Sequence, residues 1–156
     1  MSAGGNTLRI LRLRREIEMF EKEQTGFLCY PKVEDVYDEL VAHMEGPEKS
    51  PYENKTFKLK ISLPGNYPHE PPLVKFTTPV YHPNIDKEGR ICLDLLKNSE
   101  WKSTNKLLDV LNSIKVLLSN PNCDDPLMQD IANEYRFNNT QYLENAKKNS
   151  GDSSLA

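Results

Sequence analysis

The stretch Thr56-Phe57-Lys58-Leu59-Lys60-Ile61-Ser62-Leu63 alternates strictly between apolar and polar side chains. A period of two is typical of a β-strand that buries one face and leaves the other face in water. The sequence therefore predicts a strand over Thr56–Leu63 with one buried and one wet face.

Three further strand-like runs lie on either side of this stretch, at Phe27–Tyr30, Tyr37–Met44 and Leu73–Phe76. Gly46-Pro47 and Ser50-Pro51 punctuate the connection before the alternating stretch. Strands that follow one another at such short spacing favour an antiparallel meander. We therefore expect one four-stranded antiparallel sheet.

The N-terminal segment Thr7–Glu23 has the pattern of an amphipathic helix. Arg12 and Arg15 lie outside its apolar stripe, so we expect both to be exposed. The stripe consists of residues that recur at steps of three and four, which is the spacing of one helical face. Its main members are Leu13, Ile17 and Phe20.

Three more helices are expected, at Lys106–Ser119, Asp130–Arg136 and Thr140–Asn149. The first has a broad apolar face, and Pro121 ends it. The last residues, Ser150–Ala156, are small and polar, so we expect this tail to fray. Helices segregated from an antiparallel sheet make an α+β fold class.

The composition limits the class of protein. The chain has 156 residues and a net charge of −3, with 37% hydrophobic and 28% charged residues, as in an ordinary globular domain. We expect residues 1–156 to form a single domain with its core over about residues 7–149. The negative net charge argues against direct nucleic-acid binding, and no apolar run approaches the length that spans a membrane.

The three cysteines, Cys29, Cys92 and Cys123, are widely spaced. They form neither a disulfide framework nor a Cys-x-x-Cys zinc signature, so no metal site is predicted. Residues 1–7 have no apolar segment like that of a secretion signal. A reducing compartment, cytoplasmic or nuclear, is the expected location.

The segment from Pro64 to Pro83 contains six prolines. Each proline removes a backbone donor and restricts φ, so a rigid and irregular scaffold is expected there. The region from Tyr81 to Trp101 has no sustained periodicity either. An ordered loop of this length in a small domain is usually functional.

Three chemically capable groups stand in or near this loop region: Cys92, the triplet His82-Pro83-Asn84, and the acidic pair Asp124-Asp125. A cysteine with a histidine is compatible with a thiol hydrolase. A lone cysteine is also commonly just a small buried hydrophobe. Composition and spacing alone do not decide between these interpretations.

The motifs around these groups resemble those of the ubiquitin-conjugating enzyme (E2) family. Tyr81-His82-Pro83-Asn84-Ile85 followed by Cys92-Leu93-Asp94 is similar to its active-site signature, and Tyr67-Pro68-x-x-Pro71-Pro72 to its proline-rich segment. Trp101 and the segment Pro121–Leu127 follow in the family's order. The resemblance covers about residues 8–148. Asp86–Asp94 and Asp125–Ile131 look most like the T subtype of the family.

The resemblance implies a fold and a reaction. The fold is the UBC fold, with an N-terminal helix, a four-stranded antiparallel meander, an active-site loop, a crossover helix and two C-terminal helices. The reaction is ubiquitin transfer. Cys92 would accept ubiquitin from an E1 activating enzyme as a thioester and pass it to a lysine amine of a substrate protein. No cofactor is implied, because the E1 enzyme is the partner that uses ATP.

Roles for the neighbouring residues follow from the same resemblance. Asn84 would bind the developing oxyanion or hold the loop beside Cys92. Asp125 would align the lysine and help it lose a proton, although an aspartate before proline often only caps a turn. Asp94 and Asn122 would line the same channel, and His82 would brace the loop.

Partner surfaces are also implied by the family. E1 and RING-type E3 ligases would bind the first helix and two loops, at Arg12, Arg15, His69, Trp101 and Lys102. The loops depart from the family pattern, because His69 stands where many relatives have an apolar aromatic residue. Lys102-Ser103-Thr104 likewise follows Trp101 where relatives have a proline.

The crossover helix would hold the donor ubiquitin, through Asn112 and Lys115. Two other interpretations compete with ubiquitin transfer. An inactive E2-like scaffold would lack the cysteine, whereas Cys92 is present with Asn84 and Asp125. A thiol protease would need a base presented to the thiol, and the proline-flanked His82 is poorly suited to that.

Overall fold

The centre of the fold is one antiparallel sheet with the strand order β1-β2-β3-β4. The computed structural model describes residues 3–151, with side chains from residue 7 onward. The strands are β1 (Phe27–Val33), β2 (Val36–Glu45), β3 (Thr56–Ser62) and β4 (Leu73–Phe76). Each strand pairs with its neighbours in the chain, so the predicted meander is confirmed.

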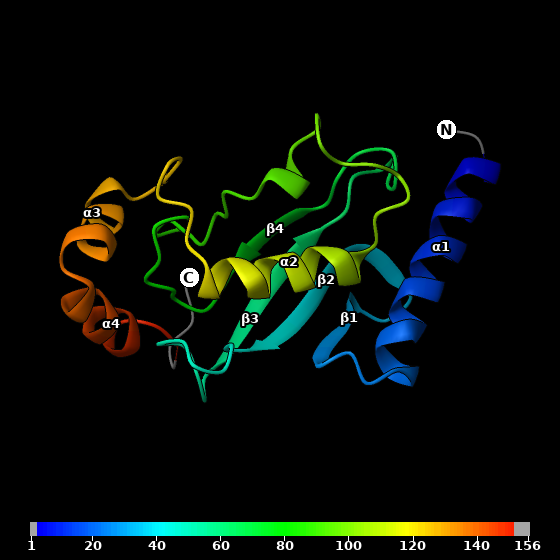
Figure 1. Cartoon of the computed structure of the whole chain (residues 1–156). Helices are drawn as coiled ribbons and strands as arrows, with labels where there is room; N and C mark the ends of the chain where they lie inside the picture. Colours follow the sequence, from blue (N-terminus) through cyan, green and yellow to red (C-terminus); the bar gives the residue numbers. More distant parts are fainter. Residues whose placement is uncertain (1–2, 152–156) are drawn as a thin grey trace.

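Helices cover one face and both ends of this sheet (Figure 1). Helix α2 crosses the front of the strands, α1 stands at the β1 end, and the last two helices pack together at the opposite end. The helices are α1 (Ala3–Lys22), α2 (Leu107–Ser119), α3 (Gln129–Phe137) and α4 (Asn139–Lys148). The architecture is therefore the expected α+β arrangement.

The alternating stretch behaves as predicted. Phe57, Leu59 and Ile61 are buried, whereas Lys58 between them is exposed. These side chains belong to one hydrophobic core that also takes the apolar faces of the first helix and the crossover helix. The core members from these two helices are Leu13, Ile17, Phe20, Leu107, Val110, Leu111, Ile114 and Leu118. The opposite face of the sheet is left to solvent.

Two boundaries differ by more than one residue from the sequence-based expectation. Strand β1 continues past Tyr30 through Pro31, with an irregular register between Pro31 and Val33. This is possible because β1 is an edge strand, where a proline removes no necessary hydrogen bond. Helix α1 begins at Ala3, four residues before the predicted start.

The predicted fraying of the tail is wrong at its first residue. Ser150 is buried, and its hydroxyl accepts a hydrogen bond from the backbone N–H of Tyr81 at 2.9 Å. The end of α4 is thereby fastened to the segment that leads into the active-site loop. Gly151 is also held, because its backbone N–H donates to the Pro79 carbonyl at 2.9 Å. Residues 152–156 of the predicted tail lie outside the described residues.

Within residues 3–151, no helix is both long and apolar enough to cross a membrane. Over the same residues, no cluster of three or more histidine, cysteine or acidic side chains is arranged to hold a metal ion.

Candidate active site

Cys92 lies at the end of the long loop, just before the 3₁₀ turn η1 (Asp94–Leu96). Its backbone N–H donates to the carbonyl of Asn84 at 2.9 Å, so the thiol is held beside the His82-Pro83-Asn84 triplet. The side chain is half-buried, and its Sγ lies 3.7 Å from Oδ2 of Asp125. The structure thus brings together the cysteine and the acidic residue that are 33 positions apart in the chain.

Asn84 joins the two halves of this site. Its side chain is fully buried. Its Oδ1 accepts from the backbone N–H of Asn122 at 2.8 Å, and its Nδ2 donates to the carbonyls of Asn122 and Asp125 at 2.8 and 3.3 Å. The amide therefore uses both its donor and its acceptor to place the Asp125 loop beside Cys92.

His82 is a second brace of the same loop. Its Nδ1 accepts from the backbone N–H of Asn84 at 2.9 Å, so Nε2 carries the proton and donates to the Leu117 carbonyl at 2.8 Å. Complete burial lowers the pKa of this imidazole to about 4. Both ring nitrogens are occupied, and the ring is neutral at physiological pH. It therefore cannot serve as a base for Cys92.

A tight turn supports the segment that leads to Cys92. Asp86 Oδ1 accepts from the backbone N–H groups of Glu88 and Arg90, and Asp86 Oδ2 lies 2.6 Å from Arg90 Nε. Gly89 has a φ of +87°, and a Cβ at this position would lie 1.9 Å from the Phe76 carbonyl oxygen. Only glycine fits such a position, which lets the turn press against strand β4.

The electrostatics keep the thiol protonated. Burial raises the pKa of Cys92 above its ordinary value, and the Asp125 carboxylate raises it further, while the Lys97 ammonium opposes both effects. A thiol protease keeps its catalytic cysteine as a thiolate. The Cys92 thiol is instead uncharged and lies beside a carboxylate. It is suited to losing its proton only when a partner presents an electrophile.

Lys97 is a site residue that the sequence did not reveal. Its Nζ lies 2.9 Å from Asp94 Oδ1 and 3.8 Å from Asp125 Oδ2, which places one cation between the two predicted acids. The side-chain hydrogen bond to Asp94 raises the pKa of Lys97. The sequence feature that could have pointed to Lys97 is its position, five residues after Cys92 and on the turn that follows it.

Asn122, which was predicted to line the same channel, is exposed. Its side-chain oxygen accepts a hydrogen bond from the backbone N–H of Asp124 at 3.1 Å.

The residues predicted for partner binding fall into two groups. Arg15, His69 and Lys102 are exposed. Arg12 is not exposed as predicted, because its guanidinium donates to the carbonyls of Ser103 and Asn105, both at 2.6 Å.

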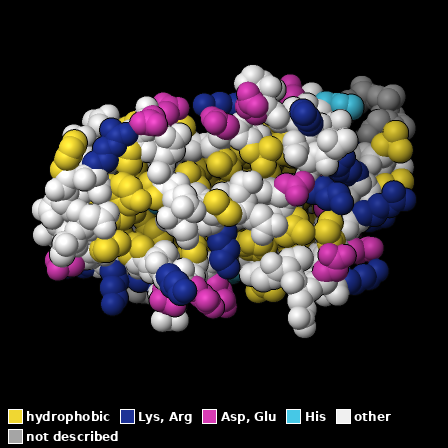
Figure 2. Space-filling model, viewed as in Figure 1, with side chains coloured by type: hydrophobic (Ala, Val, Ile, Leu, Met, Phe, Trp, Pro, Cys, Tyr) yellow, Lys and Arg dark blue, Asp and Glu magenta, His cyan; other side chains and the backbone are white. Residues whose placement is uncertain are grey.

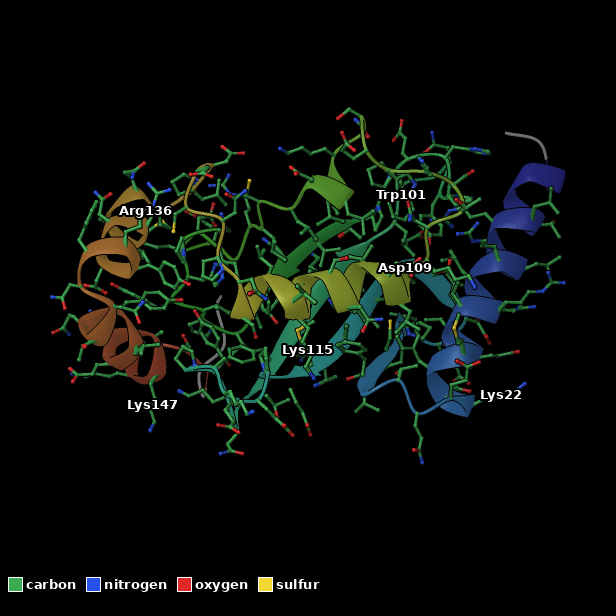
Figure 3. The ribbon with its side chains drawn as sticks, in the orientation of Figure 1. Lys22, Trp101, Asp109, Lys115, Arg136 and Lys147 are labelled. Atoms are coloured by element: carbon green, nitrogen blue, oxygen red, sulfur yellow. The ribbon has the colours of Figure 1, made fainter. Side chains whose placement is uncertain are left out.

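Trp101 was also predicted to bind partners, but it is buried. The ring is buried against Tyr67, and its Nε1 donates to the Pro68 carbonyl at 2.8 Å. Trp101 (labelled in Figure 3) directly precedes Lys102, and its hydrogen bond to Pro68 joins this loop to the loop that carries His69. Trp101 therefore holds the partner loops in position and is not itself exposed for a partner to contact.

The two residues predicted to touch donor ubiquitin, Asn112 and Lys115, extend from helix α2 toward different surroundings. Asn112 is exposed and lines a groove of about 380 Å³ together with Val116 and Leu93. Leu93 follows Cys92 directly in the chain. Lys115 instead extends toward β1, where its Nζ lies 5.7 Å from the centre of the Phe27 ring (Figure 3). The exposed Val116, which the sequence interpretation missed, shares the groove with Asn112 because the two stand one helical turn apart.

The two remaining cysteines are separate from this chemistry. All three cysteines are free thiols. Cys29 is buried in β1, and this burial raises its pKa to about 12, so it is an inert core residue. Cys123 is half-buried, with its Sγ 3.9 Å from the Ala132 carbonyl of α3.

Comparisons with known proteins agree with this arrangement. A family model described as ubiquitin-conjugating enzyme matches residues 12–150. Ubiquitin-conjugating enzyme E2 T of Xenopus laevis is 46% identical over 144 residues, which is 90% of this chain and 74% of that protein. E2 T of Homo sapiens is 44% identical over 144 residues, 90% of this chain and 73% of that protein. Ubiquitin-conjugating enzyme E2 N of Macaca fascicularis is 50% identical over 102 residues, 65% of this chain and 66% of that protein.

Proposed function

The chain belongs to the ubiquitin-conjugating enzyme family and is similar to its E2 T members, and from that premise we propose how its own residues carry out the transfer. Cys92 accepts ubiquitin from an E1 enzyme, and the ubiquitin then passes to a lysine amine. The observation that carries this proposal is the 3.7 Å contact between Cys92 Sγ and the Asp125 carboxylate, in a site where His82 is not available as a base.

The first step exchanges one thioester for another. Cys92 loses its proton as its sulfur attacks the thioester carbonyl on E1, and the E1 thiolate leaves. Asp125 Oδ2 is the oxygen placed to receive the Cys92 proton. Asp125 then passes this proton to the departing E1 thiolate and is a carboxylate again. The acylated sulfur has no proton, so this carboxylate is free to bind an incoming amine.

The second step forms the amide. The lysine nitrogen attacks the thioester carbonyl, the C–S bond breaks, and Cys92 leaves as a thiolate. Asp125 accepts the proton that the amine loses and is placed to return it to the sulfur. Asn84 acts as a positioning residue, because its buried amide fastens the backbone of Asp125 at 3.3 Å.

The exposed residues of α1, of the two loops and of the α2 groove suggest where the partners bind. E1 and an E3 ligase, of the RING type, bind the α1 face at Arg15 and the loops at His69 and Lys102. Donor ubiquitin rests in the groove at Asn112 and Val116. No bound cofactor is needed, because ATP is consumed by the E1 partner, and the location is the cytoplasm or the nucleus.

The test separates the second step from the first. We expect Asp125→Asn that has first been charged to completion by E1 to discharge ubiquitin to free lysine about 100-fold more slowly in a single turnover, because a positioned base is lost. Asp124→Asn is the matched control, since this neighbouring carboxylate is exposed and paired with Arg136 at 2.6 Å. Equal discharge rates for the two variants would remove Asp125 from the mechanism.

The same assay tests the donor surface. Asn112→Ala is expected to slow discharge in the absence of an E3 enzyme, because the groove holds the donor ubiquitin less well. An unchanged rate would show that Asn112 does not contact it.

A further inference from the structure

The segment that leads into the His82-Pro83-Asn84 triplet is held by contacts from distant parts of the chain rather than by strand pairing. Pro79–Tyr81 lies between β4 and the triplet, outside the four strands. Pro79 and Pro83 have no backbone N–H, which removes donors that pairing with a neighbouring strand would need. The groups that fix this segment therefore decide where the triplet begins.

The residues that follow α4 make two of these contacts. Ser150 Oγ accepts from the backbone N–H of Tyr81 at 2.9 Å. The backbone N–H of Gly151 donates to the Pro79 carbonyl, also at 2.9 Å. A third contact comes from Tyr52, whose hydroxyl donates to the Tyr81 carbonyl at 2.5 Å. The peptide groups on both sides of Tyr81 are thereby fixed, directly before the triplet.

Lys55, which directly precedes β3, holds the residues after α4 in turn. Its Nζ donates to the carbonyls of Lys147 and Ser150, the second at 2.6 Å. The last carbonyls of a helix have no partner within the helix and carry partial negative charge, so they suit an ammonium group. Figure 1 shows the end of α4 beside the turn that precedes β3. Lys55, Ser150 and Gly151 together form a clamp, the α4 clamp.

Short links connect the α4 clamp to the reacting groups. Tyr81 is followed by His82, whose Nδ1 accepts from the Asn84 backbone at 2.9 Å. The Asn84 side chain in turn donates to the Asp125 carbonyl at 3.3 Å. A shift of about 1 Å in a group that aligns the reactants can cost about 100-fold in rate. Movement of Tyr81 would therefore affect the carboxylate that receives the proton of the amine.

We propose that Lys55 and Ser150 are positioning residues for ubiquitin transfer. By fixing the Tyr81 backbone, the α4 clamp keeps Asp125 in place beside Cys92. Lys55 and Ser150 act only through the segment that they hold. This proposal rests on the ubiquitin transfer proposed above, and it gives the end of α4 a part in catalysis.

The experiment measures single-turnover discharge of ubiquitin from the charged full-length chain to free lysine. Lys55→Met keeps the length of the side chain but removes its ammonium donors. We expect this variant to discharge about tenfold more slowly than the wild-type chain, because Tyr81 is less firmly held. Lys55→Arg keeps a cation with several donors and should recover most of the wild-type rate.

The matched control is Lys148→Met. Lys148 is also a cation in the last turn of α4, but its side chain is exposed. Basic and acidic side chains are mixed on the face drawn in Figure 2, so the loss of one exposed cation should change the charge of the surface little. Lys148→Met should therefore keep the wild-type discharge rate.

A double-mutant cycle separates positioning from a general loss of structure. In the Asp125→Asn background, Lys55→Met should slow discharge only about twofold or less, because the group that the α4 clamp positions is already absent. Ser150→Ala removes the hydrogen bond at the other end of the clamp and should give the same pattern. A variant that had only lost stability would slow discharge by the same factor in both backgrounds.

Three results would overturn the proposal: wild-type discharge by both Lys55→Met and Ser150→Ala, slowing by an equal factor with and without the Asp125 carboxylate, or a Lys55→Arg chain as slow as Lys55→Met. In each case the wild-type chain still discharges ubiquitin, so only the clamp proposal fails. If the wild-type chain does not discharge at all, the proposed transfer fails.

Discussion

At the scale of single residues, the histidine and the asparagine of the His82-Pro83-Asn84 triplet are held by hydrogen bonds to the backbone. The Nδ1 of His82 accepts from the Asn84 backbone, while Asn84 holds the backbone of the Asp125 loop. Their positions beside Cys92 suggested chemistry, and a direct oxyanion contact by Asn84 was one alternative. The geometry supports the other alternative, in which Asn84 holds the loop beside Cys92.

The depressed pKa of His82 makes stability depend on pH. Its folded pKa is about 4 and its ordinary value is 6.5, so between these values the unfolded chain binds more protons than the folded chain. Stability is therefore fully present above about pH 6.5 and is lost as the pH falls to about 4. The contribution of His82 is on the order of 3 kcal/mol over this window.

Denaturant unfolding between pH 7.5 and pH 4 measures this effect. His82→Gln should be less stable at neutral pH and should lose less stability than the wild-type chain on acidification. Carboxylates and His43 titrate in both proteins, so the difference between the two curves isolates His82. Parallel curves would show that folding does not lower the pKa of His82.

At the scale of elements, one buried carboxylate joins the first helix to the crossover helix. Glu16 of α1 is 4% exposed. Its Oε1 accepts the backbone N–H of Leu107 at the start of α2, and its Oε2 accepts from the Tyr67 hydroxyl, both at 2.7 Å. Arg12 completes the cluster at 3.2 Å and also holds the loop before α2. The helix proposed to bind E1 and E3 is thereby fixed to the helix proposed to hold donor ubiquitin.

Removing the charge of Glu16 should loosen this junction. We expect Glu16→Gln to lower the free energy of unfolding by about 2 kcal/mol, because buried donors lose a charged acceptor. The control is Glu18→Gln on the same helix, whose carboxylate is 55% exposed and lies 3.6 Å from Lys22. Exposed pairs of this kind contribute less than about 1 kcal/mol. Equal losses in urea unfolding would show that the junction is not important.

At the scale of the whole molecule, local patterns predicted the fold well. The period-two stretch in β3 and the apolar stripe of α1 each depend on neighbours in the sequence, so both were visible there. The extension of β1 through Pro31 was not, because it depends on this strand lying at the edge of the sheet. The burial of Ser150 depends on a contact with Tyr81, 69 positions away.

The candidate site was predictable only in part for the same reason. The motif brought Cys92, Asn84 and Asp125 into consideration, and the structure adds which atoms meet. The approach of Lys97 to Asp125, the inward contacts of Arg12 and Trp101, and the direction of Lys115 are set by partners distant in sequence.

The central claim is that Cys92 carries ubiquitin as a thioester, and charging the chain with E1, ATP and ubiquitin on a non-reducing gel tests it most directly. We predict a band heavier by one ubiquitin that disappears with a thiol reductant, is absent in Cys92→Ala and persists in Cys123→Ala. No such band in the wild-type chain, or a reductant-sensitive band that remains in Cys92→Ala, would contradict the account.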